Sequence, residues 1–244
     1  MSQKVALITG GARGIGKQIG LALARKDWNI AICYRTSEDD DNETVGLIQE
    51  IGPEAYSQKA DVSAPKAAKE LVKNVEKKFG RIDALINCAG PYHRTNILKE
   101  TPEGWNRMFD NNLHPVFYLT QAVSIGMMER ESGRIINFSM ANADKMMAQT
   151  EVTAHYIAKA GVLMLTRAFA RQLAAHGITV NAISPGFIDS GSAPEEELQD
   201  MLKRIPAGYI GSPKDAVVAA LYLLSDEAAY VNGSNIILSG GWGL

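Results

Sequence analysis

Short runs of β-branched and apolar residues alternate with longer amphipathic segments along the whole chain. The short runs predict strands at Val5–Thr9, Ile30–Cys33, Ala55–Lys59, Ala84–Asn87, Ile135–Ser139, Thr179–Ser184 and Asn235–Leu238. The segments between them predict helices at Ile15–Lys26, Asn42–Ile51, Pro65–Phe79, Pro102–Glu129, Thr153–His176 and Asp215–Leu224. Because alternating strands and helices form βαβ units, we expect a doubly wound α/β fold with a mainly parallel sheet of about seven strands, covered by helices on both faces.

One interval breaks this alternation. Residues Gly186–Pro213 are rich in glycine and proline around a short charged helix, predicted at Glu195–Arg204. The interval follows the sixth predicted strand, and ligands of parallel α/β domains bind at the carboxyl ends of the strands. It is therefore either a mobile lid over a ligand or a plain surface excursion. No linker-like tract or repeat divides the chain, so residues 1–244 should form a single domain.

Composition and charge exclude several classes of function. The chain is 46% apolar and 21% charged, with a net charge of −2, which is typical of a globular enzyme-sized domain and predicts no nucleic-acid partner. No apolar run reaches the roughly 18 residues that a membrane span requires, and the first residues lack a signal-peptide pattern. The two cysteines lack metal-ligand spacing. We expect a cytoplasmic protein without a metal or a membrane partner.

The segment TGGARGIG, residues 9–16, follows the first predicted strand and opens the first helix. Glycines permit a tight turn there and let backbone N–H groups approach a pyrophosphate at the helix N-terminus. A glycine needed for helix packing would give a similar sequence, but the position after the first strand favours dinucleotide binding. The candidate contacts are Gly10, Arg13, Gly14, Ile15 and Gly16.

The second predicted strand ends in Cys33-Tyr34-Arg35-Thr36, without the acidic residue that would bond the ribose hydroxyls of NAD(H). Arg35 can instead pair with a 2′-phosphate, assisted by Arg13 and the hydroxyls of Thr36 and Ser37. A surface arginine is the alternative. The pattern favours NADP(H) as the cofactor.

Further motifs follow in order: Asp61-Val62, NCAG at 87–90, NNLHPVF at 111–117, AKAGV at 158–162, ISPGFI at 183–188 and SDEAAYVNGSNIILSGGW at 225–242. With the glycine-rich segment, they make the whole chain resemble the short-chain dehydrogenase/reductase family, nearest its 3-oxoacyl-acyl-carrier-protein reductase and pteridine reductase branches. The resemblance implies a Rossmann-type fold and a homotetramer, in which Pro102–Glu129 and Thr153–His176 form one interface. It also implies cofactor contacts from Asp61, Val62, Asn87, Ala89, Gly90, Lys159, Pro185, Gly186 and Ile188.

Catalysis in this family resembles a relay of asparagine, serine, tyrosine and lysine. Asn112 and Lys159 match the family positions. The family tyrosine stands four residues before the lysine, where this chain has His155, while Tyr156 stands one residue later. The position of the family serine holds Met140, and Ser139 precedes it. The candidate catalytic residues are Asn112, Ser139, Tyr156 and Lys159.

Helical geometry leaves the identity of the acid open. With about 100° per residue, His155 lies about 40° from Lys159 and Tyr156 about 60° away on the other side, so both can contact the lysine but cannot both face the nicotinamide. A local unwinding or a π-bulge would bring Tyr156 into the site. His155 is in register, but a neighbouring ammonium lowers the pKa of an imidazole and makes it a poor proton donor near neutral pH.

Two functions therefore remain. One is an NADPH-dependent reductase of a carbonyl or related unsaturated group, on a small-molecule or acyl-carrier-borne substrate, with an atypical active site. The other is a catalytically impaired NADP(H)-binding protein with a sensing or structural role.

Overall fold

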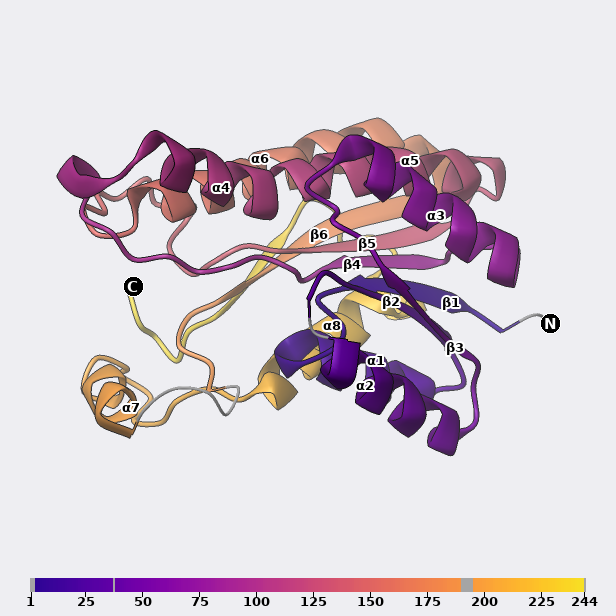
Figure 1. The fold of residues 1–244 in the computed structure, drawn as a ribbon, viewed down its shortest axis with the longest axis horizontal. Helices are drawn as coiled ribbons and strands as arrows, with labels where there is room; N and C mark the ends of the chain where they lie inside the picture. The colour runs from indigo at the N-terminus through magenta and orange to yellow at the C-terminus, as the bar shows by residue number, and fades with distance from the viewer. Residues whose placement is uncertain (1–2, 37, 190–194, 244) are drawn as a thin grey trace.

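The computed structural model of the chain describes residues 3–36, 38–189 and 195–243. Its centre is a parallel sheet in the order β3-β2-β1-β4-β5-β6-β7 (Figure 1). The strands are β1 (Val5–Thr9), β2 (Asn29–Tyr34), β3 (Ala55–Lys59), β4 (Ala84–Asn87), β5 (Gly133–Phe138), β6 (Ile178–Pro185) and β7 (Asn235–Leu238). The predicted doubly wound, seven-stranded fold is confirmed.

Helices cover both faces of the sheet (Figure 1). One face carries α1 (Gly14–Ala24), α2 (Glu38–Ile51) and α8 (Pro213–Leu224). The other carries α3 (Pro65–Phe79), α4 (Pro102–Asn112), α5 (His114–Glu129) and α6 (Thr153–Leu173). A further helix, α7 (Glu195–Leu202), lies apart from both layers, and short 3-10 turns occur at Ile97–Lys99, Ala174–His176 and Asp226–Ala228.

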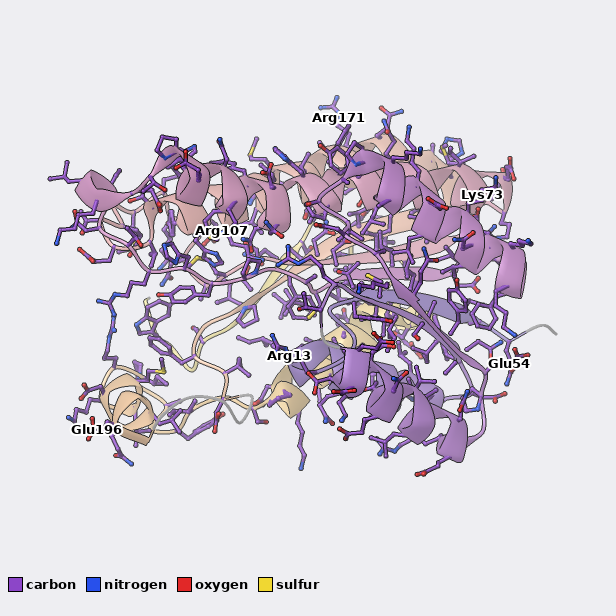
Figure 2. The ribbon with its side chains drawn as sticks, viewed as in Figure 1. Arg13, Glu54, Lys73, Arg107, Arg171 and Glu196 are labelled. Atoms are coloured by element: carbon purple, nitrogen blue, oxygen red, sulfur yellow. The ribbon has the colours of Figure 1, made fainter. Side chains whose placement is uncertain are left out.

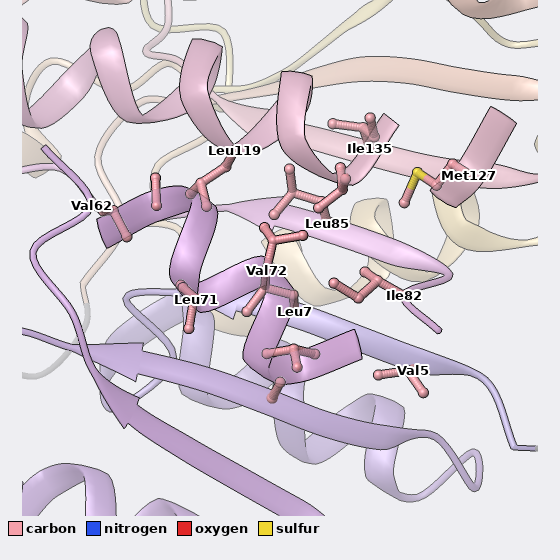
Figure 3. Packing of buried hydrophobic residues seen from close by; sticks show 14 of the residues in the cluster. Val5, Leu7, Val62, Leu71, Val72, Ile82, Leu85, Leu119, Met127 and Ile135 are labelled. Carbon is pink, nitrogen blue, oxygen red and sulfur yellow. The ribbon is translucent and has the colours of Figure 1, made fainter. Parts of the chain in front are cut away.

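Strand alternation divides the core between the two faces. In β1, Val5 and Leu7 pack toward α3 and α5, whereas Ala6 and Ile8 pack toward α1 and α8. Figure 3 shows the first of these clusters, in which Leu71 and Val72 of α3 lie close to the strand side chains. Because successive side chains of a strand point to opposite faces, nearly every residue of β1 must be apolar.

The strand order reverses between β1 and β4, which are neighbours in the sheet. Their carboxyl ends are joined by Thr9, whose Oγ1 accepts hydrogen bonds from the backbone N–H groups of Cys88 and Ala89, each at 3.1 Å. A ligand crevice is expected at such a switch point. This contact holds the glycine-rich loop after β1 against the loop after β4.

The single helix predicted over Pro102–Glu129 is wrong, because the chain forms two helices that meet at Leu113. Pro115 has no N–H to donate to the carbonyl of Asn111, so the helical ladder is interrupted at this point. Leu113 has φ −106° and ψ −52° and serves as the C-cap of α4 and the N-cap of α5. The break places Asn112 at the end of α4.

The candidate lid is described only in part. Helix α7 ends at Leu202, slightly before the predicted Arg204, and a bridge pairs Ile188 with Gly211. Gly191 and Pro194 lie outside the described residues. The lid therefore stays a prediction.

A chain of buried polar side chains joins the centre of the sheet to α6. The Nδ2 of Asn87 in β4 donates to Oδ1 of Asn137 in β5 at 2.8 Å, and Nδ2 of Asn137 donates to Oγ1 of Thr166 at 3.0 Å. Thr166 in turn donates to the carbonyl of Val162 at 2.8 Å. These amides are buried, so each lost partner would leave a polar group without water.

We predict that Thr166→Val lowers the free energy of unfolding by about 1–3 kcal/mol, because the isosteric side chain leaves Nδ2 of Asn137 without an acceptor. Urea denaturation followed by circular dichroism measures the effect. Thr166→Ser keeps the hydroxyl and is the matched control. An equal loss in both variants would show that the hydrogen bond contributes nothing.

Candidate functional site

A groove of about 720 Å³ runs along the carboxyl ends of β1, β2 and β4. The glycine-rich loop forms one wall, and the segment after β4 forms another. Of the residues predicted to hold the cofactor, the groove is lined by Gly10, Arg13, Gly14, Ile15, Gly16, Arg35, Thr36, Asp61, Val62, Ala89, Gly90 and Ile188. Asn87, Lys159, Pro185 and Gly186 lie outside this lining.

The glycine-rich loop leaves no room for side chains at two positions. A Cβ on Gly16 would collide with the carbonyl oxygen of Gly10, and Gly10 itself has φ +66°, a left-handed conformation that favours glycine. Helix α1 begins at Gly14, directly behind this turn. A flat backbone surface in front of a helix N-terminus is the arrangement that accepts a pyrophosphate, so this part of the site fits a dinucleotide.

At the end of β2, Arg35 extends from the strand with an exposed guanidinium, and its Nη1 donates to Oδ1 of Asn111 in α4 at 2.7 Å. Arg13 lies at the start of α1, in the helical layer on one face of the sheet, whereas Arg107 of α4 lies in the layer on the other face (Figure 2). Both Arg13 and Arg35 line the groove, which fits a phosphate on the adenosine ribose. Ser37, the other predicted contact, lies outside the described residues.

Asp61 lies near Arg35, at the start of the turn after β3. The hydroxyl of Ser63 donates to Asp61 at 2.7 Å, and this bond, together with the guanidinium of Arg35, lowers the pKa of the Asp61 carboxyl. Asp61 is therefore an anionic acceptor at neutral pH, as contact with an adenine amine requires. The neighbouring Val62 is buried and supplies apolar surface.

Asn112 and Lys159 meet behind Gly90. A Cβ on Gly90 would collide with Oδ1 of Asn112 and would lie 3.2 Å from Nζ of Lys159. The amide Nδ2 of Asn112 donates to the carbonyls of Met108 and Pro91, at 3.0 and 3.1 Å. Its buried Oδ1 has no hydrogen-bond partner within the described ranges. This orphaned acceptor fits the water or hydroxyl group that a proton relay requires.

Lys159 is buried, and its Nζ donates to the carbonyl of Phe138 at 2.9 Å. Burial lowers the pKa of the ammonium to about 8, because the charged form loses hydration. Such a group remains largely protonated near neutral pH and can also release its proton. It supplies a positive charge next to the wall of the groove.

Tyr156 faces away from this pair. Its hydroxyl donates to the carbonyl of Asn142 and accepts from the backbone N–H of Met147 at 3.0 Å. Both partners belong to the loop between β5 and α6, and the tyrosine is 5% exposed. Helix α6 is an uninterrupted α-helix, so the unwinding or π-bulge that would rotate Tyr156 toward the groove is not present in it. In this conformation the hydroxyl serves to hold the loop.

His155 occupies the position that faces the groove wall. Its imidazole lies close to the backbone of Pro91, and its ring meets that of Tyr92 edge to face. Nδ1 is buried and without a partner in the described part of the chain. Burial, and then the charge of Lys159, lower the pKa of His155 to about 4. The side chain is therefore a neutral imidazole near neutral pH.

Ser139 is also committed elsewhere. Its hydroxyl donates to the backbone carbonyl of Lys159 at 2.8 Å, so it fastens β5 to α6. Met140, at the family serine position, packs against Ala143 and Leu163. Neither side chain presents a hydrogen-bond donor to the groove in this conformation.

Tyr92 and Asn111 are among the groove residues that the sequence reasoning missed. Tyr92 is 64% exposed, and its ring meets that of His155 edge to face, with centroids 5.3 Å apart. An aromatic residue directly after NCAGP was a usable signal for it. Asn111 gave no signal of its own, because its role depends on a contact with Arg35 from a distant strand.

Other classes of site find no support in the described residues. No helix among them is long and apolar enough to cross a membrane. Across the same ranges, no three His, Cys, Asp or Glu side chains gather in a way that could hold a metal ion.

Comparison with known proteins identifies the family. The family described as "Enoyl-(Acyl carrier protein) reductase" matches residues 10–243. A 3-oxoacyl-(acyl-carrier-protein) reductase from Staphylococcus epidermidis is 39% identical, with 98% of each chain covered. An acetoacetyl-CoA reductase from Shinella zoogloeoides is also 39% identical, again with 98% of each chain covered.

Solved structures agree with these sequence matches. A structure from Sinorhizobium meliloti 1021, described as a short-chain alcohol dehydrogenase, has a TM-score of 0.91 and 32% identity, covering 99% of this chain and 96% of the other. Levodione reductase has a TM-score of 0.92 and 25% identity, with 99% and 98% covered. The chain belongs to the short-chain dehydrogenase/reductase family and resembles its 3-oxoacyl-acyl-carrier-protein reductases.

Proposed function

We propose that this protein is an NADPH-dependent oxidoreductase that reduces a carbonyl group. The observation that supports it most is the groove that runs from a glycine-rich, arginine-flanked end to Gly90, behind which lie the buried side chains of Asn112 and Lys159. When bound, the nicotinamide supplies the hydride. The two relatives of 39% identity are named as reductases of an acyl-carrier-linked and a CoA-linked substrate, so we propose a small-molecule or acyl-carrier-borne carbonyl substrate.

The cofactor end of the proposal rests on charge. Arg35 and Arg13 are cations on the groove wall, and the end of β2 carries no carboxylate to bond a ribose diol. A 2′-phosphate placed there would receive charge-assisted hydrogen bonds from a planar guanidinium. Asp61 and the loop after β4 would hold the adenine and the ribose.

The proton-transfer end is atypical. Lys159 holds a proton at Nζ, and the free Oδ1 of Asn112 beside it can hold a water molecule through which that proton is replaced. The predicted acid Tyr156 and the predicted polarising residue Ser139 can act only if both hydroxyls leave their present partners. His155, as a neutral imidazole, can offer the carbonyl oxygen only weak help. We therefore propose slow turnover.

A second candidate follows from the same observation. A protein with an intact cofactor groove and no free proton donor would bind NADP(H) without efficient chemistry, and would act in sensing or in an assembly. Its distinguishing property is tight cofactor binding together with no turnover on carbonyl substrates.

Resemblance to the family also implies an oligomeric state and a cellular location. We propose a homotetramer in the cytoplasm, with α5 and α6 at one interface. Several large apolar side chains on these helices are exposed in the single chain, namely Phe117, Ile125, Ile157 and Met164. Covering them in an interface would remove apolar surface from water.

We predict that Arg35→Asp weakens NADPH binding far more than NADH binding. Each lost charge-assisted hydrogen bond to the 2′-phosphate removes about 1.5–3 kcal/mol, and the new carboxylate repels the phosphate. Titration of both cofactors against wild type and variant by tryptophan fluorescence tests this. A wild-type preference for NADH would refute the NADP(H) proposal.

For Tyr156→Phe we expect a loss of stability with NADPH affinity nearly unchanged. The phenylalanine leaves the N–H of Met147 and the carbonyl of Asn142 without partners, and one such loss lowers the free energy of unfolding by about 1–3 kcal/mol. Thermal unfolding and cofactor titration are the measurements. If turnover instead falls about 10²–10⁴-fold at unchanged stability, Tyr156 is the general acid.

For His155→Tyr we expect faster reduction of a simple ketone than in wild type. Lys159 is already placed to stabilise the phenolate and to lower the pKa of the new phenol. Adding Met140→Ser should raise the rate further, because a hydroxyl can polarise the carbonyl and a thioether cannot. NADPH oxidation is followed by absorbance.

His155→Phe is the matched control, since it introduces the same six-membered ring as His155→Tyr but without the hydroxyl. A rate for His155→Tyr no higher than for His155→Phe would show that the missing phenol does not limit turnover.

A further inference from the structure

One side-chain contact joins the two sides of the cofactor groove. Arg35 directly follows the strand β2. Asn111 lies in the last turn of α4, in the layer of helices that covers the sheet face opposite α1 and α2. Both residues line the groove, and Nη1 of Arg35 lies 2.7 Å from Oδ1 of Asn111. The distance is that of a charge-assisted hydrogen bond.

The side-chain amide of Asn111, which is the acceptor in this contact, is held in one orientation by a second hydrogen bond. Nδ2 of Asn111 donates to the backbone carbonyl of Arg107, one turn earlier in α4, at 2.8 Å. An amide whose N–H₂ group is fixed to the helix must direct its oxygen the other way, toward Arg35. Asn111 is therefore a preset acceptor rather than a mobile side chain.

The guanidinium keeps most of its donors. Arginine has five N–H groups, and within the described ranges Asn111 accepts from one nitrogen, Nη1. Asp61 is close enough for the charge of Arg35 to contribute to the lowering of its pKa, so the guanidinium lies near Asp61 as well as near Asn111. The remaining N–H groups can form a two-pronged contact with a phosphate.

We propose that Asn111 is a positioning residue for Arg35 and thereby determines the preference for a cofactor that carries a 2′-phosphate. The inference rests on the proposed use of NADP(H). An exposed arginine loses side-chain entropy when it pairs with a phosphate. The hydrogen bond to Asn111 already restricts the side chain of Arg35 before the cofactor binds, so less entropy is lost on binding. A neutral amide does this without adding a negative charge that would compete with the phosphate.

Fragments of the cofactor separate this role from catalysis. In Asn111→Leu, 2′,5′-ADP should bind about three- to tenfold more weakly, whereas 5′-AMP, which lacks the 2′-phosphate, should bind as in wild type. Isothermal titration calorimetry measures both. Asn106→Leu, at an exposed position of the same helix, is the matched control and should change neither affinity.

Two further variants test whether Asn111 acts through Arg35. Asn111→Asp should weaken 2′,5′-ADP more than Asn111→Leu, because a carboxylate pairs with the guanidinium and repels the phosphate. In an Arg35→Leu background, Asn111→Leu should have no additional effect on 2′,5′-ADP, as expected when one residue works through the other.

The contrary outcomes are distinct. Equal weakening of both fragments would mean that Asn111 contacts the adenosine directly, and tighter binding of 2′,5′-ADP to Asn111→Leu would mean that the contact holds Arg35 away from the phosphate; either result overturns the inference. A wild-type protein that binds 5′-AMP as well as 2′,5′-ADP would refute the NADP(H) proposal itself. A wild-type preference for 2′,5′-ADP that Asn111→Leu leaves unchanged refutes the role of Asn111 alone.

Discussion

The position of α6 against β5 controls the chemistry of this site. Three buried hydrogen bonds fix it: Asn137 to Thr166, Ser139 to the carbonyl of Lys159, and Nζ of Lys159 to the carbonyl of Phe138. They are distributed over two turns of the helix, so the helix can neither rotate nor slide without leaving buried polar groups unpaired. Every side chain of α6 takes its direction from this attachment.

Because adjacent residues of a helix point about 100° apart, a fixed rotation gives one of His155 and Tyr156 the position next to the groove and sends the other elsewhere. The structure gives that position to His155. Tyr156 then fills a different need, since its hydroxyl both donates to and accepts from the loop before the helix. A phenol held by two partners is no longer a free acid, and a neutral imidazole is a poor proton donor.

Much of the fold was readable from the sequence. The bounds of β1, β3, β4 and β7 agree with the predicted runs. The central strands β1 and β4 are buried along their whole length and need mainly apolar residues, whereas the edge strand β3 is partly exposed and carries Ser57, Gln58 and Lys59. The division at Leu113 was also encoded, in Pro115, but the apolar periodicity of α4 and α5 concealed it. Much of the groove lining could be predicted because it belongs to motifs that act through their backbone groups. The order of these motifs along the chain is enough to place them in the fold.

The directions of individual side chains were less accessible. Ser139 and Tyr156 were candidates because of their residue type, yet each is bonded to backbone groups that no pattern in the sequence places beside it. Asn111 and Arg35 are 76 positions apart and meet only because α4 and β2 reach the same end of the sheet. Such contacts depend on tertiary packing, so the hydrophobic periodicity of the sequence does not predict them.

The two halves of the site also differ in how they tolerate change. The proposed cofactor binding would draw on many weak contacts from glycine backbones, two arginines and an aspartate, so that replacing one contact would leave the others in place. Proton delivery needs a single hydroxyl at a single position on α6, and a shift by one residue removes it. A chain of this family can therefore keep a groove that fits NADP(H) while its proton donor is displaced. A neutral His155 beside a buried ammonium is the arrangement that the proposed function requires, with cofactor binding kept and proton delivery altered.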